Sequence, residues 1–273
     1  MSAASPFEIE LRLLLEAIFL RFHYDFRSYS MASLRRRVNA AISALGCETV
    51  SALQEKILHQ PETFAVLLQY LTVQVSDMFR DPQFFRVFRE RIVPELATYP
   101  SPRIWIAGAS AGEEVYTLAI VLAEEGLLDR AMLYATDINP EALNKARSGV
   151  YALDRLATFE ANHRMAGGKE PFDRYYTAAY GRAAFDRRLR ERVVFSDHSL
   201  ATDTVFAEVQ VVTCRNVLIY FDRPLQDRAI SLFRDALCRR GFLGLGSMES
   251  LQLSSQASAF EPFVQEQRWY RRI

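Results

Sequence analysis

The chain has 273 residues, of which 50% are hydrophobic, and its 33 basic and 33 acidic residues balance to a formal charge of zero. This length can form one large core and a smaller domain, and the composition is that of a globular protein. The zero balance excludes a global electrostatic attraction to nucleic acid or to an anionic membrane, although local charge clusters can still act.

Cysteine and histidine usage argues against disulfides and zinc. Cys47, Cys214 and Cys238 are isolated, form no CxxC pair, and have no matching histidine cluster. We therefore expect no metal site and a reducing compartment. The N-terminal stretch MSAASPFEIE lacks the basic and apolar regions of a signal peptide, and no apolar run reaches membrane-spanning length. These features predict a cytoplasmic protein without direct membrane insertion.

Residues 6–69 have apolar residues spaced near 3.6 positions apart, with Gly46 and Pro61 as breaks. This spacing predicts an all-helical N-terminal domain, which we place at residues 1–75. Within it, Arg35-Arg36-Arg37 is a basic triplet in a segment whose first 70 positions hold seven basic and seven acidic residues. The triplet is either a solvated helix face or a docking site for an acidic partner.

A connecting segment is expected at residues 76–102. Asp81-Pro82 is typical of a helix N-cap followed by proline at the first helical position, and the aromatic residues after it supply an apolar surface. The stretch QVSDMFR just before it is too polar for an ordinary core segment. The run TYPSP at 98–102 breaks the pattern and places a boundary before residue 103.

A strand, a tight turn and a helix are predicted next. Arg103–Ala107 is the strand, the small residues from Gly108 to Gly112 form the turn, and the helix begins at Glu113. Such a turn lets a ligand approach the backbone, and the start of the helix offers unpaired N–H groups. Because Glu113 and Glu114 would repel a phosphate, they favour a ligand that carries donors or positive charge.

A second predicted strand, residues 131–136, leads to Asp137, which follows Gly112 by 25 positions. This is close to the spacing at which an acidic residue binds ribose hydroxyls in doubly wound nucleotide sites. Asp137 could also be a turn or cap residue, but the glycine turn upstream favours the ribose. Asn139-Pro140-Glu141 then predicts a helix that ends at Gly149.

Residues 151–192 interrupt the alternation with an arginine-rich, aromatic stretch, which we interpret as an inserted, hairpin-rich subdomain. The remaining pattern predicts strands at 192–195, 209–213, 242–246 and 264–270 and a helix at 224–239 closed by Gly241. Residues 103–273 are thus expected to form an α/β domain with a doubly wound, mostly parallel, Rossmann-like sheet. The segment CRNVLIYF at 214–221 directly follows a strand, where ligands bind in such sheets.

Six motifs together resemble the chemotaxis protein methyltransferases of the CheR type, in order and spacing: LTVQVSDMFRDPQFF, GASAGEEVYT, YATDINPEALNKARSGVY, VVFSDHSL, CRNVLIYFD and GFLGLGSMES. These enzymes use S-adenosylmethionine to methylate glutamate side chains of bacterial chemoreceptors. The resemblance runs from about Leu71 to the C-terminus, and the family also has an all-helical N-terminal domain. It implies a class I methyltransferase sheet, S-adenosylhomocysteine as product, and the cytoplasmic helical region of a chemoreceptor as partner.

The resemblance also implies a cofactor site with Glu113 near the amino group, Asp137 at the ribose, and Ser199 and Leu200 beside the adenine. The full set drawn from the family's motifs is Gln74, Ser76, Arg80, Ala107, Glu113, Asp137, Ser199, Leu200, Arg215 and Asn216. Arg80 and Tyr220 are the candidate catalytic residues. The triplet Arg35, Arg36 and Arg37 becomes the candidate docking site for the receptor.

The chain departs from the common pattern at Gln74, Ser76, Ala109 with Ala111, and Ser199, where many members have Asn, Thr, a GCSTGEE-like turn and Asn-Leu. Cofactor affinity is the property that these changes would alter. Two alternatives stay open: a nicotinamide dehydrogenase, which predicts a G-x-G-x-x-G turn that is absent here, and a module that senses the cofactor or a nucleotide without transferring methyl groups. No nucleic-acid partner is expected, and a monomer is the default expectation.

Overall fold

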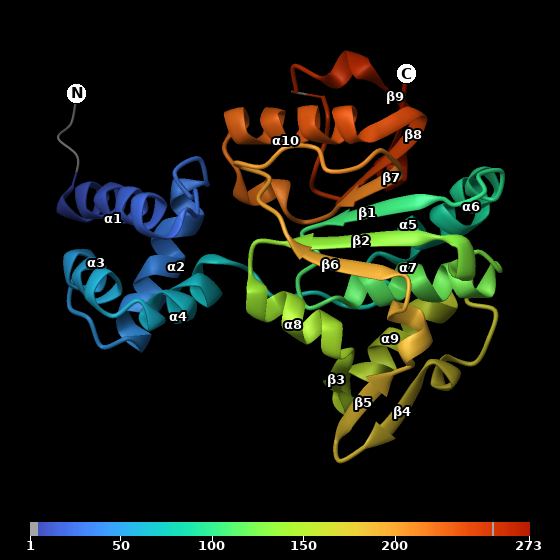
Figure 1. Ribbon diagram of the computed structural model, residues 1–273, viewed down its shortest axis with the longest axis horizontal. Coiled ribbons are helices and arrows are strands. Elements are labelled where there is room, and N and C mark those ends of the chain that lie inside the picture. The colour runs from blue at the N-terminus through green and yellow to red at the C-terminus, as the bar shows by residue number, and fades with distance from the viewer. Residues whose placement is uncertain (1–4, 253) are drawn as a thin grey trace. The chain divides into compact units, whose positions relative to one another are not determined.

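The computed structural model describes residues 5–252 and 254–273, so the first four residues of the N-terminal stretch lie outside the described part (Figure 1). The chain divides into two compact units. The first, which we call the helical unit, comprises Met1–Val73 with Ser199–Asp203 and Tyr220–Ala229. The second, the sheet unit, comprises Gln74–His198, Thr204–Ile219 and Ile230–Ile273.

The helical unit confirms the predicted all-helical N-terminal region. Its helices are α1 (Pro6–Phe22), α2 (Met31–Ala44), α3 (Val50–His59) and α4 (Glu62–Leu71). Helix α1 begins with a capping box, in which the Ser5 side chain accepts from the Glu8 N–H and the Glu8 carboxylate accepts from the Ser5 N–H. Each helix buries one apolar face, which includes Leu14 and Ile18 on α1, Leu34 and Val38 on α2, Leu53 and Ile57 on α3, and Leu67 and Leu71 on α4.

The sheet unit contains a seven-stranded sheet, within the described residues, in the order β6-β2-β1-β7-β8-β10-β9. The first five strands in this order are parallel, and β10 is antiparallel to both of its neighbours. The strands are β1 (Arg103–Ala107), β2 (Met132–Asp137), β6 (Val193–Asp197), β7 (Val209–Cys214), β8 (Leu237–Leu245), β9 (Phe260–Val264) and β10 (Trp269–Arg272). The predicted mixed α/β, doubly wound sheet is therefore confirmed.

Helices cover both faces of this sheet because side chains alternate along each strand. On β1, Ile104 and Ile106 belong to a buried core shared with Leu118 of α7 (Glu113–Glu124). Trp105 points to the other face, where its ring meets that of Phe233 on α10 (Arg223–Ala236) at a centroid distance of 5.4 Å. The other helices of this unit are α5 (Pro82–Val87), a π-helical turn (Phe88–Ile92), α6 (Val93–Leu96) and α8 (Pro140–Ser148).

The strand order reverses between β1 and β7. From β1 the chain proceeds outward through β2 and β6, and from β7 it proceeds the other way through β8. In an open sheet this reversal leaves a crevice outside the carboxyl ends of the two central strands, where ligands bind. The segments that follow Ala107 and Cys214 therefore flank the candidate site.

The expected inserted subdomain is a separate three-stranded antiparallel sheet in the order β3-β5-β4, formed by β3 (Val150–Ala152), β4 (Tyr176–Ala179) and β5 (Arg182–Phe185). Tyr180 and Gly181 both have positive φ, as a two-residue hairpin turn requires. Helix α9 (Leu156–Met165) lies between β3 and β4 in the chain and was not predicted, although Leu156, Phe159 and His163 have helical spacing and are buried.

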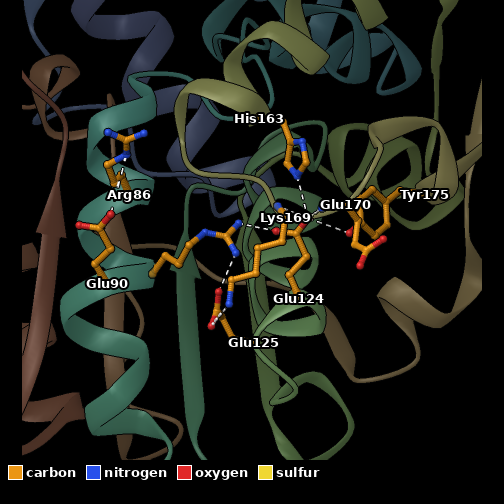
Figure 2. Close-up of polar contacts among 9 residues, drawn as sticks. Arg86, Glu90, Glu124, Glu125, His163, Lys169, Glu170 and Tyr175 are labelled. Atoms are coloured by element: carbon orange, nitrogen blue, oxygen red, sulfur yellow. Dashed lines mark hydrogen bonds and ion pairs between the residues drawn. The ribbon is translucent and has the colours of Figure 1, made fainter.

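Glu124, the last residue of α7, fixes this insertion to the rest of the sheet unit (Figure 2). Its carboxylate accepts from Arg89 Nη2 at 2.5 Å, lies 2.9 Å from His163 Nε2, and accepts from the Tyr175 hydroxyl at 2.9 Å. The backbone N–H groups of Lys169 and Glu170 donate to it as well, each at 3.2 Å. Five donors from three different segments thus meet on one buried carboxylate.

Two predicted boundaries near the end of the chain and the predicted capping role of Asp81 need correction. The helix expected at 224–239 ends at Ala236, because the chain enters β8 at Leu237 and pairs with β7 through a register shift. The single strand expected at 264–270 is two antiparallel strands, β9 and β10, separated by a turn that includes Arg268 with φ 56°. Helix α5 does begin at Pro82, but the Asp81 side chain makes no capping bond and instead binds Arg215.

Candidate cofactor and active site

The turn after β1 is held tightly against its neighbours. The N–H groups of Gly108 and Ala109 both donate to the Thr136 carbonyl, each at 2.9 Å. Gly108 has φ 79°, and a Cβ there would lie 2.4 Å from Cγ2 of Val217, so a larger residue would collide with the segment that follows β7. The turn therefore brings backbone groups of β1, β2 and the 215–219 segment together at the switch point.

Asp137 lies at the carboxyl end of β2, as predicted. Its Oδ2 accepts from the Ser110 N–H at 2.8 Å, and its Oδ1 accepts from the Asn139 N–H at 2.9 Å. Burial raises the pKa of this carboxyl, and these backbone donors oppose that effect. Since each oxygen has a further lone pair, Asp137 can accept from a diol while it keeps the turn in place.

The polar segment before α5 reaches the same turn. The Ser110 hydroxyl donates to Gln74 Oε1 at 2.9 Å, and the Phe79 N–H donates to Oγ1 of Thr117 on α7 at 2.9 Å. The structure therefore brings Gln74 together with the turn. Ser76 contributes its backbone carbonyl as an acceptor for Arg155. Arg80 is half-buried, and its side chain makes no hydrogen bond with the residues that the structure describes.

Glu113 has one oxygen engaged and one oxygen unpartnered. Its side chain is 1% exposed, and Oε1 accepts from Arg155 Nη1 at 2.7 Å. Oε2 is buried and has no hydrogen-bond partner within residues 5–252 and 254–273. Burial raises the pKa of this carboxyl, against the opposing effect of Arg155. A buried acceptor without a donor is costly in a finished core, so its presence here fits a ligand that brings a donor.

Arg215 is expected to contact the cofactor, and that contact remains a prediction. Its side chain is 3% exposed, and it donates to Glu114 at 3.0 Å, to Asp81 at 2.8 Å and to the Arg80 carbonyl at 2.8 Å. The guanidinium also lies 4.2 Å from the ring centroid of Phe84. With these partners, Arg215 holds Arg80 and Asp81 in place.

Glu249 is a site residue that sequence reasoning missed. Its buried carboxylate accepts from the N–H groups of Asn216 at 3.0 Å, Val217 at 2.9 Å and Gly246 at 2.7 Å. It thereby fixes the segment after β7, including Asn216, whose φ is 60°. In the sequence it lies in GFLGLGSMES, one of the six family motifs, but that match gave Glu249 no role of its own.

Four non-glycine residues with positive φ lie in these site segments: Phe79, Asp81, Ser110 and Asn216. Such conformations cost about 1–3 kcal/mol each unless the surroundings enforce them, and they concentrate at functional sites. The contacts of Thr117, Arg215, Asp137 and Glu249 described above are the enforcing interactions. The strain supports the assignment of this region as the functional site.

Ser199, Leu200 and Tyr220 belong to the helical unit. The Ser199 N–H donates to Asp203 at 2.9 Å, and Leu200 is buried. Tyr220 is half-buried, and its carbonyl accepts from the Ser30 N–H at 2.8 Å. Their proposed cofactor and catalytic contacts remain predictions.

The arginine triplet needs a correction. Arg35 and Arg36 are exposed, and Arg35 pairs with Glu8 at 2.5 Å. Arg37, however, is 7% exposed, donates to the Leu71 carbonyl at 2.5 Å, and stacks on the Tyr220 ring at 4.3 Å. Successive residues of a helix point about 100° apart, and Arg37 lies with Leu34, Val38 and Ala41 on the buried face of α2. Arg37 is therefore not part of an exposed docking patch.

In the part of the chain that the structure describes, no group of three or more His, Cys, Asp or Glu side chains could hold a metal ion. No helix among the same residues is long and apolar enough to cross a membrane.

The chain is similar to known proteins over most of its length. A family model described as "CheR methyltransferase, SAM binding domain" matches residues 74–267, and one described as "CheR methyltransferase, all-alpha domain" matches residues 9–72. The "Putative methyltransferase Cher3" of Pseudomonas putida is 55% identical over 272 residues, which is 100% of both chains. "Chemotaxis protein methyltransferase 2" of Pseudomonas aeruginosa is 32% identical over 70% of this chain and 68% of that protein.

Among solved structures, the glycopeptide N-methyltransferase MtfA complexed with sinefungin aligns with 12% identity and a TM-score of 0.37. The alignment covers 63% of this chain and half of that one.

Proposed function

Because the chain belongs to the CheR methyltransferase family, as both family models establish, we propose that it methylates glutamate carboxylates on the cytoplasmic helical region of a bacterial chemoreceptor. It is an S-adenosylmethionine-dependent methyltransferase of the chemotaxis class, which confirms the family, cofactor and enzyme class expected from its motifs. The dehydrogenase and sensor alternatives are set aside. A cytoplasmic location follows from the proposed substrate.

The unpartnered Oε2 of Glu113 is the observation that carries the cofactor assignment. The amino-acid end of S-adenosylmethionine carries an ammonium group, which is a cationic hydrogen-bond donor. Among the described residues, Oε2 of Glu113 has no such donor. Asp137 presents acceptors to a ribose from the neighbouring strand end, and Gln74 adds a side chain from the opposite segment. The residues of the switch point thus fit the cofactor.

The chemistry needs little from the protein beyond positioning. S-adenosylmethionine supplies a methyl carbon that its sulfonium group already activates. A glutamate side chain, with a pKa of about 4.3, is ionised at neutral pH and needs no general base. The protein must hold the attacking oxygen in line with the methyl carbon and sulfur, an effect worth roughly 7–11 kcal/mol in the best cases.

We assign the orientation of the substrate carboxylate to Arg80 and the Tyr220 hydroxyl, as proposed from the sequence. The guanidinium of Arg80, which makes no hydrogen bond among the described residues, supports this assignment. The stacking of Arg37 on Tyr220, which restrains that ring, supports it too. Arg80 should contact the carboxylate without a full bidentate ion pair, because such a pair would reduce its nucleophilicity. Exposed Arg35 and Arg36 remain the proposed docking residues for an acidic receptor helix.

Calorimetry with S-adenosylhomocysteine, followed by transfer of radiolabelled methyl groups to receptor cytoplasmic fragments, tests this function. We expect wild type to bind and to transfer, and Glu113→Gln to bind about 10- to 100-fold more weakly, since one hydrogen bond to a charged group contributes about 1.5–3 kcal/mol. The exposed Glu160→Gln is the matched control. Binding without transfer to any receptor fragment would contradict the proposed substrate, and equal binding by Glu113→Gln would contradict the cofactor geometry.

A further inference from the structure

The insertion contributes a charged side chain to the cofactor site. Arg155 ends a short 3-10 turn (Leu153–Arg155) between β3 and α9, and it lies 42 positions after Glu113 in the chain. Its Nη1 donates to Glu113 Oε1 at 2.7 Å, and its Nη2 donates to Asp77 Oδ1 at 2.8 Å and to the Ser76 carbonyl. One guanidinium therefore joins the start of α7 to the polar segment on the other side of the site.

A second residue of the insertion supports the turn from the same side. The Tyr151 hydroxyl on β3 donates to the Ala111 carbonyl at 2.8 Å and is buried. A Cβ on Gly112 would lie 3.1 Å from that hydroxyl, which shows how closely the ring approaches the turn. Arg155 is itself restrained, since its guanidinium lies 4.8 Å from the Phe159 ring centroid. The insertion thus holds both the turn and the first helical residue.

The contacts of Arg155 determine which oxygen of Glu113 is available. Because Arg155 occupies Oε1, the carboxylate is held with Oε2 as its unpartnered acceptor. Two acceptors on Ser76 and Asp77 tie the same guanidinium to the 74–80 segment. If the guanidinium were removed, Glu113 would lose its ion-pair partner and the 74–80 segment would lose two hydrogen bonds.

We propose that Arg155 is a positioning residue for S-adenosylmethionine, which aims Glu113 at the cofactor's ammonium group and fastens Ser76 and Asp77 beside it. This inference rests on the cofactor assignment made above. It adds that the inserted subdomain, which lies outside the Rossmann-like sheet, is required for full cofactor affinity. Arg155 need not touch the reacting atoms.

Arg155→Ala, Arg155→Lys and the control Arg164→Ala test the proposal in the full chain. Arg164 lies on α9 of the same insertion, and its ion pair with Glu160 is exposed. By calorimetry we expect S-adenosylhomocysteine to bind Arg155→Ala about tenfold more weakly, Arg155→Lys to recover part of the affinity because the charge is kept, and Arg164→Ala to bind like wild type. The melting temperature of each variant without ligand identifies any loss of folding.

Two readouts separate positioning from a purely structural role. Without Arg155, a larger fraction of Glu113 is protonated before the ligand binds, so binding should release more protons. Repeating the calorimetric titration in buffers of different ionisation enthalpy measures this release. Hydrogen exchange of residues 74–80 should be faster in ligand-free Arg155→Ala than in Arg164→Ala. Wild-type affinity and wild-type exchange in Arg155→Ala would overturn the inference, and so would weaker binding without either change. Failure of wild type to bind would instead overturn the cofactor assignment.

Discussion

Helix α7 carries a buried glutamate at each end, and the two carboxylates have opposite surroundings. Both Glu113 and Glu124 are 1% exposed. At the first residue, burial raises the pKa of Glu113, and Arg155 only partly offsets it. At the last residue, burial would likewise raise the pKa of Glu124, but hydrogen bonds from His163, Arg89 and Tyr175 lower it to about 2 (Figure 2).

The helix dipole would produce the opposite order. A carboxylate is favoured at a helix N-terminus and disfavoured at a C-terminus by about 0.3–1 kcal/mol. The direct donors therefore outweigh the dipole, since each hydrogen bond to a charged group contributes about 1.5–3 kcal/mol. Burial and helix position therefore do not distinguish the two carboxylates. Glu113, at the binding site, has an oxygen without a donor among the described residues, whereas the hydrogen bonds of Glu124 stabilise the fold.

Replacing Glu124 should have the largest effect on stability. Glu124→Gln removes one of the two carboxylates that pair with Arg89, the other being Glu125 at 2.7 Å, and truncating one partner of a buried ion pair costs up to about 3–5 kcal/mol. Urea unfolding at pH 7 should show this loss, while the exposed Glu160→Gln should change stability by less than about 0.5 kcal/mol. Affinity for S-adenosylhomocysteine, measured well below the melting temperature, should stay near wild type. A cofactor defect with normal stability would reverse the roles assigned to the two ends.

Of the two buried glutamates of α7, the sequence identified Glu113 as a functional residue but not Glu124 as a structural one. Glu113 was identified because it follows a glycine turn at the end of a strand, and that local pattern has a chemical meaning. Glu124 could not be identified, because its side-chain donors come from 35 to 51 positions away, in segments with no local pattern in common. For the same reason the partners of Glu113 and Asp81, which are Arg155 and Arg215, appeared only in the structure.

The fold was likewise predicted well where the signal is local in the sequence, and less well where contacts between distant residues decide the structure. Strands and helices with a clear period, such as β1, α7 and α8, were predicted within about a residue at most ends. The end of α10 was misplaced, because pairing of Leu237 with Val209 on β7 decides where the helix stops. Arg37 was placed on the surface because it belongs to a run of three arginines on a predicted helix, whereas its contacts with Leu71 and Tyr220 bury it.

Thr117, one turn after Glu113, offers a smaller perturbation of the binding end. Its hydroxyl donates to the Glu113 carbonyl at 2.8 Å and accepts from the Phe79 N–H. Thr117→Val keeps the shape but leaves that buried N–H without an acceptor, at a cost of about 1–3 kcal/mol. Calorimetry should show weaker S-adenosylhomocysteine binding, and Thr117→Ser, which keeps the hydroxyl, should restore it. If Thr117→Val binds like wild type, the 74–80 segment does not depend on α7.

Lowering the pH should protonate Glu113 before Glu124, because their pKa values lie on opposite sides of the ordinary value near 4.5. Binding an ammonium group requires ionised Glu113, whose raised pKa means that cofactor affinity is lost as the pH falls through a value above 4.5. Below that value, affinity should fall about tenfold per pH unit. Glu124 behaves in the opposite way: its contribution to stability is present above the unfolded pKa and is lost only as the pH falls toward about 2.

A window of mildly acidic pH should therefore exist in which the protein is folded but binds the cofactor weakly. Burial dominates the pKa of Glu113, and the charges of Arg155 on the insertion and Lys145 on α8 oppose it. The buried Tyr151 also faces this carboxylate. Burial raises the pKa of Asp137 too, so Asp137 can also make cofactor affinity depend on pH. The pH dependence of affinity that Glu113→Gln abolishes is the part due to Glu113. Calorimetry and circular dichroism on the same samples would measure both curves, and coincident loss of binding and folding would show that the two ends of α7 do not act independently.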